Sequence, residues 1–450
     1  MKPIQFEKED RLSSEIVFRD PVHDYIHVRH QLILDLIDSK EFQRLRRIKQ
    51  LGTSQYTFHG AEHSRFSHSL GVYELSRKIC DRFIRNYPEY WDDSERLVTL
   101  CAALLHDIGH GPFSHTFEKI FETDHEQLTI EIILDEQTEV NQILQRVGPD
   151  FPNQVASVIT KEYPNPQVVQ LISSQIDADR MDYLQRDAYY TGVTYGMFDA
   201  SRILRVIRPF EGGIAFQHQG MHAVEDYIVR RYQMYMQVYF HPVSRGMEVT
   251  LDRLLTRAID LYKQDQLFSY LPALEPFLKK EFDVYDYLEI DDHILMAAIA
   301  SWVHHEDDYL SELATMFLNR KPLKSVEFNR ETDLETVEYL RSLVDKLFYD
   351  QKYFTMTNRS SDISYDYSIK EKAPITLIYP NGEVVDLSEV SAIVRILSDN
   401  LHGNDLLYVP RELLRNHLPA QQEFEIFSDV YYEFKKHIKN GQIWHKNDEN

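Results

Sequence analysis

The feature that most constrains the fold is an apolar run that ends in histidines and an aspartate. Residues 97–105 are mostly apolar and lead into His106-Asp107-Ile108-Gly109-His110-Gly111-Pro112-Phe113-Ser114-His115. Apolar residues on all sides predict a central, buried helix. The glycines and the proline end this helix, because the residue before a proline avoids the α region. Burying a carboxylate beside imidazoles is costly unless something compensates, so the stretch predicts a metal site.

Most of the chain before residue 350 predicts helices. Residues 16–30 surround a proline and indicate short extended segments. The apolar residues of 42–51 recur at helical spacing, and Gly52 is placed to end that helix. Further helices are expected over residues 72–83 with His68 at the beginning, from His125 onward, over residues 176–187 and over residues 225–239.

The chain changes character near residue 350. Residues 356–372 are polar and predict a loop, and Pro380-Asn381-Gly382-Glu383 is a hairpin signal. Ile375–Tyr379 and Leu406–Val409 are strand candidates. The expected fold is mainly α, with two parts: a helical catalytic core with an extended N-terminal segment over residues 1–350, and a small α+β C-terminal region over residues 351–450.

Charge and cysteine content restrict the partners and the compartment. A formal net charge of −23 argues against nucleic acid as a partner, since Lys and Arg carry affinity for phosphates. Cys80 and Cys101 lie in apolar helical patterns, which indicates buried thiols rather than a disulfide. The N-terminal residues lack an apolar signal core, and no run reaches the ~20 apolar residues of a membrane span. The expected location is cytoplasmic, without a membrane partner.

Adjacent His106 and Asp107 can reach one ion if that ion lies off the edge of the helix. A histidine and an aspartate from elsewhere would complete four protein ligands, and the candidates are His68 and Asp179. Imidazole and carboxylate together suit a divalent ion of Mn, Fe, Zn, Ni or Co, with Mg less favoured. Four ligands leave positions on a six-coordinate ion for water and a substrate oxygen, as hydrolysis needs. The alternative is a polar network of the same side chains without metal.

A further set of side chains is cationic or able to donate a proton: Arg65, His110, His115, His125, Arg180 and Arg231. His110 and His115 follow the helix break, where side chains can point into a cleft. Such a set suits an anionic substrate whose leaving group needs a proton, so phosphate ester cleavage is the natural inference. A structural role is the alternative for each of the three histidines and for Arg231.

Five motifs stand out in the first half of the chain: Asp20-Pro21-Val22-His23, Phe42-Gln43-Arg44-Leu45-Arg46, Arg65-Phe66-Ser67-His68-Ser69-Leu70-Gly71-Val72, the stretch from His106 to His115, and Ile176-Asp177-Ala178-Asp179-Arg180-Met181-Asp182-Tyr183. In these motifs the chain resembles the HD-domain metal-dependent phosphohydrolases. More narrowly, it resembles the deoxynucleoside triphosphate (dNTP) triphosphohydrolases of that family. The similarity covers about residues 16–245, with a weaker similarity at residues 407–410.

The resemblance implies that water attacks the α-phosphorus of a dNTP and releases a deoxynucleoside and inorganic tripolyphosphate. It implies that the metal ligands are His68, His106, Asp107 and Asp179. It implies that the catalytic residues are His110, which would protonate the 5′-oxygen, His125 and Glu118. Glu118 stands where the family often has Asp, and it would orient a catalytic histidine. Additional Mg would accompany the nucleotide triphosphate.

The same resemblance assigns the substrate contacts. The phosphates would contact Arg65, His115, Arg180 and Arg231. The sugar would be surrounded by Gln50, Leu51, Tyr183, Asp187 and Tyr239. Gln50 and Asp187 would bond the 3′-hydroxyl, and the aromatic wall would reject a 2′-hydroxyl, which would be left crowded and unpaired. Tyr235 stands where a histidine contacts phosphate in the vertebrate member of the family.

The family also includes tetramers that a nucleotide activates. Asp38, Gln43 and Arg46 match residues that bind an activating guanine nucleotide. A carboxylate can accept from the N1 and N2 hydrogens of guanine, and Arg can donate to O6 and N7. Arg202 matches a contact to a second nucleotide. The resemblance thus implies an allosteric homotetramer, with the C-terminal region in its contacts.

Three departures from the family leave the identity of the activator open. Gln217 and Gln219 stand where basic residues are expected, and Ile16 replaces a lysine. Two other functions stay open as alternatives. One is another HD phosphohydrolase, acting on a nucleoside monophosphate, a cyclic nucleotide or guanosine tetraphosphate. The other is a non-catalytic nucleotide sensor or nucleic-acid-binding scaffold.

Overall fold

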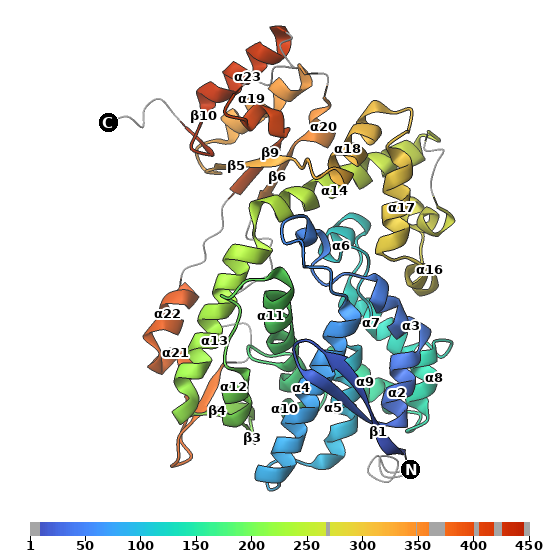
Figure 1. The fold of residues 1–450 in the computed structure, drawn as a ribbon, viewed down its shortest axis with the longest axis vertical. Helices are drawn as coiled ribbons and strands as arrows, with labels where there is room; N and C mark the ends of the chain where they lie inside the picture. The colour runs from blue at the N-terminus through green and yellow to red at the C-terminus, as the bar shows by residue number, and fades with distance from the viewer. Residues whose placement is uncertain are drawn as a thin grey trace.

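The computed structural model describes residues 10–266, 271–347, 349–359, 374–399, 405–417 and 425–444. Helices make up most of it, and the predicted mainly α fold is confirmed. Figure 1 shows an elongated molecule, with the N-terminal helices at one end and helices α19 (Leu334–Asp345) and α23 (Glu425–His437) at the other. Among the described residues, no helix is long and apolar enough to cross a membrane.

The predicted extended segments form an antiparallel hairpin. Strand β1 (Arg11–Asp20) pairs with β2 (Asp24–His30). The carboxylate of Asp20 accepts from the backbone amides of Val22 and His23, each at 2.9 Å, so it fixes the turn that contains the proline. The hairpin packs against the helix formed by residues 65–86 (Figure 1).

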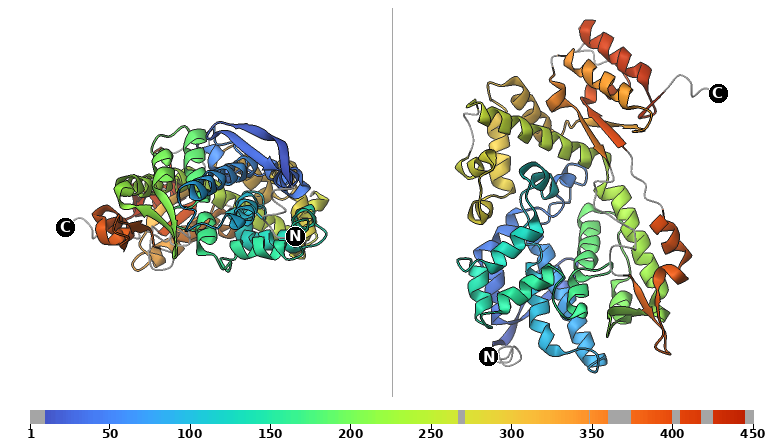
Figure 2. Two further views of the ribbon diagram at one scale, coloured as in Figure 1. Left: turned by 90° about the horizontal axis from the view of Figure 1, so that it is seen from below. Right: turned by 180° about the vertical axis from the view of Figure 1, so that it is seen from behind.

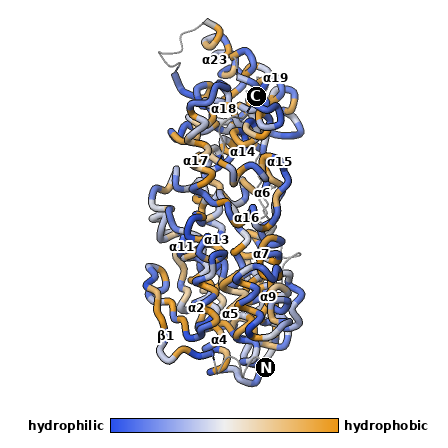
Figure 3. Tube along the Cα trace, turned by 90° about the vertical axis from the view of Figure 1, so that its right-hand side faces the viewer, coloured by the Kyte–Doolittle hydropathy of each residue, from blue (hydrophilic) through white to orange (hydrophobic). Residues whose placement is uncertain are grey.

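Helices α4 (Arg65–Asn86), α5 (Arg96–Leu105) and α11 (Ala178–Thr191) form the centre of the N-terminal part. All residues from Leu97 to Leu105 are buried, as the apolar run predicted, and Figure 3 shows α5 as hydrophobic. A Cβ at Gly71 of α4 would lie 1.8 Å from Asp182 Oδ1, so glycine is required where α11 approaches. This close approach brings the carboxylates of α11 to His68.

The predicted helix over residues 42–51 is wrong in its second half. Helix α2 (Gln31–Asp38) precedes the segment, α3 (Lys40–Arg44) ends within it, and a 3₁₀ turn, η1 (Leu45–Arg47), follows. Ser39 caps α3 by accepting from the Phe42 amide. Beyond η1, Lys49 forms a β-bridge with Ser64, because the backbone there bonds to other segments instead of continuing the helix.

The remaining helices of the N-terminal part surround this centre. They are η2 (Gly52–Tyr56), η3 (Asp93–Glu95), α6 (His115–Phe121), α7 (His125–Leu134), α8 (Glu139–Gln145), α9 (Phe151–Ile159), α10 (Pro166–Ile172), α12 (Ala200–Val206), η4 (His218–Gly220), α13 (Met221–Met234) and the π-helical turn η5 (Tyr235–Tyr239). The predicted helical segments near residues 125, 176–187 and 225–239 are confirmed by α7, α11 and the α13–η5 pair.

A second apolar core forms around α14 (Pro242–Lys263). The helices associated with it are η6 (Pro272–Leu274), α15 (Glu275–Lys279), α16 (Val284–Glu289), α17 (Asp292–Trp302), α18 (Asp308–Leu318), α19, α20 (Gln351–Phe354), η8 (Arg411–Leu414) and α23. Within the stretch from 106 to 115, Ile108 belongs to the first core and Phe113 to this second core, together with Phe117. The stretch from 106 to 115 therefore joins the two cores.

The C-terminal segments contribute to two separate sheets. Strand β7 (Thr376–Ile378) pairs with β8 (Val384–Asp386) through the predicted hairpin and also with β4 (Gly213–Gln217), which pairs with β3 (Ile207–Phe210). Strand β9 (Asp405–Val409) lies between β5 (Lys324–Phe328) and β6 (Met356–Arg359). The short strands β10 (Ile438–Lys439) and β11 (Gln442–Ile443) extend this second sheet. Both predicted strands are confirmed.

The segment that follows residue 350 contributes a strand to the second sheet. The predicted loop over 356–372 begins as strand β6, because its backbone pairs with β9; residues 360–372 lie outside the described residues. Helices α21 (Leu387–Val390) and α22 (Ala392–Asp399) lie beside α13 (Figure 2). The division of the chain at residue 350 stays a prediction.

Candidate active site

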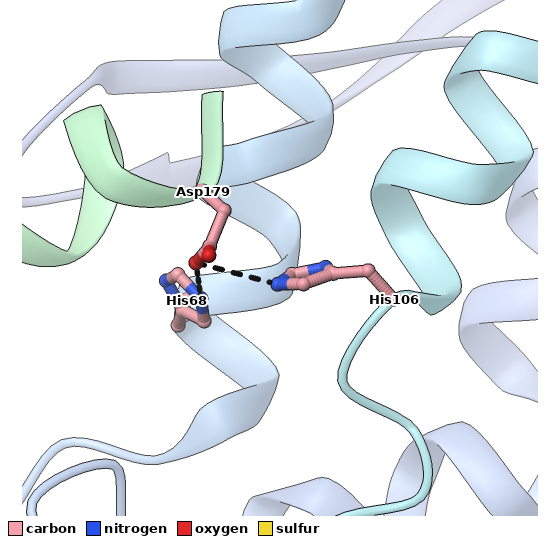
Figure 4. A group of neighbouring side chains, drawn as sticks. All are labelled: His68, His106 and Asp179. Carbon is pink, nitrogen blue, oxygen red and sulfur yellow. Dashed lines mark ion pairs between the residues drawn. The ribbon is translucent and has the colours of Figure 1, made fainter. Parts of the chain in front are cut away.

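Three of the predicted metal ligands converge on one point. His68 comes from the first turn of α4, His106 from the end of α5 and Asp179 from the start of α11. Asp179 Oδ1 lies 3.1 Å from His68 Nε2 and 3.5 Å from His106 Nε2 (Figure 4). These donor atoms lie within 4.8 Å of one another, so the three side chains could hold a metal ion.

Asp107, the fourth predicted ligand, lies beside this group. Its Oδ1 is 3.4 Å from His106 Nε2, and its Oδ2 is 3.7 Å from His68 Nε2. The same carboxylate also pairs with Arg65 Nη1 at 2.5 Å and with His110 Nε2 at 3.3 Å. Burial works against its charge, but His106, His110 and Arg65 hold the pKa of Asp107 well below its usual range. Asp107 thus joins the metal ligands to the residues that follow them.

Hydrogen bonds fix the orientation of both histidines. His68 Nδ1 lies 2.8 Å from Asp182 Oδ2, and His106 Nδ1 lies 2.9 Å from the carbonyl of Ala103. In both cases the acceptor requires the proton on Nδ1, which leaves Nε2 with a free lone pair towards Asp179. Both Nε2 atoms are buried and have no hydrogen-bond partner.

This arrangement fits a divalent cation. Two buried imidazole nitrogens without hydrogen bonds face carboxylate oxygens, which is the donor set that transition metals prefer. Although burial opposes a charged ring, the neighbouring carboxylates of Asp179 and Asp182 raise the pKa of His68 to about 10. The centre therefore favours a positive charge at this position.

A buried hydrogen-bond network holds Asp182, the carboxylate that orients His68. Asp182 Oδ1 lies 2.6 Å from His23 Nε2, and Arg186 donates to Asp182 at 2.8 Å and to Asp20 at 2.8 Å. Sequence reasoning assigned no role to these four residues. The positions of Asp20, His23 and Asp182 in the Asp20–His23 and Ile176–Tyr183 motifs were a usable signal, as was the spacing of Asp182 three residues after Asp179, whereas Arg186 lies outside these motifs.

The turn that follows helix α5 positions the next histidines of the site. A Cβ at Gly109 would lie 2.3 Å from the His125 carbonyl, so glycine allows α7 to approach the turn. The rings of His110 and His125 stack there, with centroids 3.9 Å apart. Glu118, one turn into α6, lies 2.6 Å from His125 Nδ1 and 2.9 Å from His115 Nδ1. Glutamate at position 118 therefore reaches both histidines.

The two stacked histidines differ in their electrostatics. Burial and the positive charges of Arg65 and His125 hold the pKa of His110 well below its ordinary value. Although burial opposes it, the hydrogen bond to Glu118 raises the pKa of His125. Of the two rings, His125 therefore binds a proton more readily, whereas the resemblance gave the proton-donor role to His110.

A second hydrogen-bonded group contains three of the residues predicted to surround the sugar. Asp187 accepts from Tyr239 Oη at 2.7 Å and from His63 Nε2 at 2.8 Å. The backbone carbonyl of His63 accepts from the backbone amide of Gln50 at 3.0 Å. Gln50 Oε1 is buried without a hydrogen bond. Sequence reasoning missed His63, for which no pattern in the chain gave a signal. Leu51 follows Gln50 and is partly buried.

Tyr183, Tyr235 and Tyr239 form an aromatic wall. The hydroxyls of Tyr183 and Tyr235 lie 3.2 Å apart, and the ring of Tyr239 packs against both rings. Burial raises the pKa of Tyr183, and the guanidinium groups of Arg231 and Arg180 oppose that shift from nearby. Arg180 pairs with Asp177, and Arg231 donates to the carbonyl of Gln175 at 2.9 Å.

The predicted phosphate contacts therefore lie in two places. Arg65 lies at the turn with His110, where Arg65 Nη2 also donates to Ser114 Oγ at 2.7 Å, and the side chain of His115 is 77% exposed. Arg180 and Arg231 lie by the aromatic wall. The carboxylates of α11 divide between two groups: Asp179 and Asp182 contact His68, whereas Asp187 belongs to the group with His63.

The predicted allosteric residues lie away from this centre. Gln43 donates to the Ile37 carbonyl at 2.7 Å and accepts from Arg46 Nε at 2.8 Å. Arg46 lies over the ring of Phe66, and Asp38 is exposed at the end of α2. Arg202 donates to the carbonyl of Gln219 and lies on α12, on the opposite side of the molecule from α2 and α3 (Figure 1). Within one chain, Arg202 and the other three cannot share a ligand.

Comparison with known proteins assigns this helical histidine–aspartate centre to a class, the phosphohydrolases. Residues 65–187 match the HD domain, and residues 198–347 match the HD associated region. The chain belongs to the HD-domain family.

Its relatives include proteins with and without an assigned activity. An uncharacterized protein of Bacillus subtilis, YwfO, is 52% identical over 90% of this chain and 94% of its own length. A Dictyostelium discoideum deoxynucleoside triphosphate triphosphohydrolase, a SAMHD1 homolog, is 32% identical over 57% of this chain and 52% of its own length. The crystal structure of a phosphohydrolase from Bacteroides thetaiotaomicron superposes with a TM-score of 0.79 at 28% identity, covering 88% of this chain and all of that one.

The network behind His68 leads to a prediction for metal affinity. Asp182→Asn keeps the shape of the side chain but removes the charge that orients His68 and makes it a better ligand. We expect metal affinity to fall about 10- to 100-fold, the usual cost of losing such a partner. Metal titration of the purified variant measures the change. The matched control is Asp226→Asn, which alters an exposed ion pair with Arg230; equal affinities in the two variants would contradict the assigned role.

Proposed function

We propose that this protein hydrolyses dNTPs, with the help of a divalent metal ion, to a deoxynucleoside and inorganic tripolyphosphate. The observation that carries the proposal is the junction at Asp107, whose carboxylate contacts both metal-site histidines and also Arg65 and His110. Metal ligands and groups that can neutralise or protonate a phosphate are thus neighbours. The dNTP triphosphohydrolases among the relatives support the same reaction.

The residues of this chain can be assigned to steps of that reaction. A divalent ion held by His68, His106, Asp107 and Asp179 would make water more acidic and polarise a phosphate oxygen. The charge of the triphosphate would be neutralised by Arg65, His115, Arg180 and Arg231. His110 would pass a proton to the 5′-oxygen that leaves, and His125, held by Glu118, would fix the His110 ring in place through the ring stack.

The sugar would lie in the group formed by Asp187, His63 and Gln50. Both oxygens of Asp187 already accept hydrogen bonds, whereas Gln50 Oε1 is buried and lacks one, so Gln50 supplies the acceptor for a 3′-hydroxyl. The ring of Tyr239 would close the face where a ribonucleotide carries its 2′-hydroxyl. This arrangement supports discrimination against ribonucleotides, because an unpaired buried hydroxyl is costly.

The test is product analysis with each dNTP alone and in pairs, with the metal varied among Mn, Fe, Zn, Ni, Co and Mg. Tripolyphosphate and deoxynucleoside as the products support the proposal. Release of pyrophosphate or orthophosphate instead would assign the protein to another class of HD phosphohydrolase. Tight nucleotide binding without turnover would identify a sensor.

We also propose that a bound nucleotide activates the enzyme in a homotetramer. Gln43 and Arg46 are bonded to each other, and Asp38 is exposed nearby, so a carboxylate, an amide and a guanidinium are available for a guanine base. Arg202 lies far from them within one chain, so a shared site would need residues of a second subunit. The C-terminal region would take part in the subunit contacts, and the cytoplasmic location stays a prediction.

Activation leads to a second prediction. Arg46→Ala removes the donor to the guanine base while its neighbour Arg47, which pairs with Asp291, stays in place. We expect the activator concentration for half-maximal rate to rise about tenfold, the usual value of one bidentate contact. Initial rates against GTP or dGTP concentration measure this shift. Arg47→Ala is the matched control, and an equal response of the two variants would rule out the assigned contact.

A further inference from the structure

Two consecutive residues of the turn after α5 have unusual backbone conformations. Phe113 has a φ of 51° and Ser114 a φ of 48°, and neither is glycine. Such conformations are sparsely populated and persist only where the surrounding structure holds them, often at functional sites. The strained pair lies between His110 and His115, so its conformation determines where both histidines and Ser114 point.

Asp292 holds the strained pair. Its Oδ1 accepts from the Phe113 amide at 3.0 Å, and its Oδ2 accepts from the Lys49 amide at 2.9 Å. The side chain stands at the first position of α17, where Asp291 already caps the helix by accepting from His293 and Ile294. The carboxylate of Asp292 is therefore not needed as a cap. Asp292 is 3% exposed, and a carboxylate is buried this deeply only where its bonds offset the lost hydration.

Arg44 holds the other end of the same turn. Its Nη1 donates to the His110 carbonyl at 2.9 Å, and its Nε donates to the Ile290 carbonyl at 3.0 Å. Arg44 is 1% exposed and lies over the ring of Tyr287. Residues 290–292, which belong to the HD associated region, thus fix the turn 110–114 at both ends.

We propose that Asp292 is a positioning residue for the reaction, which rests on the function proposed above. Through the Phe113 amide it holds Ser114, whose Oγ accepts from Arg65 Nη2. Arg65 in turn contacts Asp107. The associated region thereby sets the geometry of the catalytic turn without touching substrate or metal.

The test compares Asp292→Asn with Asp291→Asn. Asn at 292 can accept only one of the two amide bonds, whereas Asn at 291 is itself a good helix cap and does not contact the turn. We expect kcat of Asp292→Asn to fall about 10- to 100-fold, as misplacement of reacting groups commonly causes, with KM within about threefold. Metal content should equal that of Asp291→Asn. Asp292→Ala, which loses both bonds, should show the larger loss.

Hydrogen–deuterium exchange tests the contact without any assumption about the substrate. Peptides covering residues 108–117 should exchange faster in Asp292→Asn than in Asp291→Asn, because the Phe113 amide loses its acceptor. If the wild type hydrolyses no dNTP, the proposed function fails, and turnover of bis(p-nitrophenyl) phosphate together with the exchange data still decides the role of Asp292. Unchanged kcat, unchanged exchange, or a loss of metal that accounts for the lost activity would overturn the proposal.

Discussion

Asp179→Asn should lower the rate of hydrolysis about a thousandfold, which corresponds to roughly 4 kcal/mol of activation free energy. Asp179 Oδ1 is the oxygen that faces both His68 Nε2 and His106 Nε2. The neighbouring imidazoles of His106 and His68 outweigh burial and lower the pKa of Asp179, so the wild-type side chain is a carboxylate. An amide at this position leaves two neutral imidazoles and one remaining carboxylate, Asp107, to balance a divalent cation.

Metal analysis and kinetics on the same preparation check this prediction. The variant should contain little metal after gel filtration, and added metal should restore only part of the rate. The control is Asp226→Asn, the same chemical change in an exposed pair on α13, which should keep both metal and rate. A variant at 179 that retains stoichiometric metal and full activity would exclude Asp179 as a ligand.

The part of the centre that sequence could predict is the part that local patterns encode. The apolar run, the break at Gly109 and Pro112, and the helix with His68 near its beginning follow from periodicity and proline geometry, and the structure has them. Asp179 was placed by the resemblance and by its type, since nothing local shows that α11 packs on α4. That packing depends on Gly71, whose missing side chain leaves room for Asp182.

The parts that sequence could not predict are contacts between distant segments. His63 reaches Asp187, and Asp292 reaches Phe113, across separations of 124 and 179 residues. The helix predicted over residues 42–51 failed for the same reason. Its apolar residues do recur at helical spacing. However, the hydrogen bonds of the buried Arg44 side chain and the Asp292–Lys49 bond hold the backbone in a non-helical conformation. Tertiary contacts of this kind override local propensity.

His110→Ala should lower kcat about 100- to 10,000-fold on a dNTP while metal content stays at the wild-type level. The ring lies next to the metal-site carboxylate Asp107 yet is not one of the converging ligands His68, His106 and Asp179. Its loss therefore removes proton transfer and leaves the centre intact. His222→Ala, at an exposed histidine on α13, is the control for the substitution itself.

The choice of leaving group separates proton donation from other roles of His110. The 5′-oxygen of a deoxynucleoside needs a proton to leave, whereas p-nitrophenolate does not, because it is the anion of an acidic phenol. With the p-nitrophenyl ester of thymidine 5′-phosphate as substrate, the loss in His110→Ala should shrink to less than about tenfold. The same comparison in His125→Ala tests the other ring of the stack, whose pKa the hydrogen bond to Glu118 raises although burial opposes the shift. Should the leaving-group effect appear in His125→Ala and be absent in His110→Ala, the proton reaches the substrate directly from His125, and His110 serves to hold that ring in place.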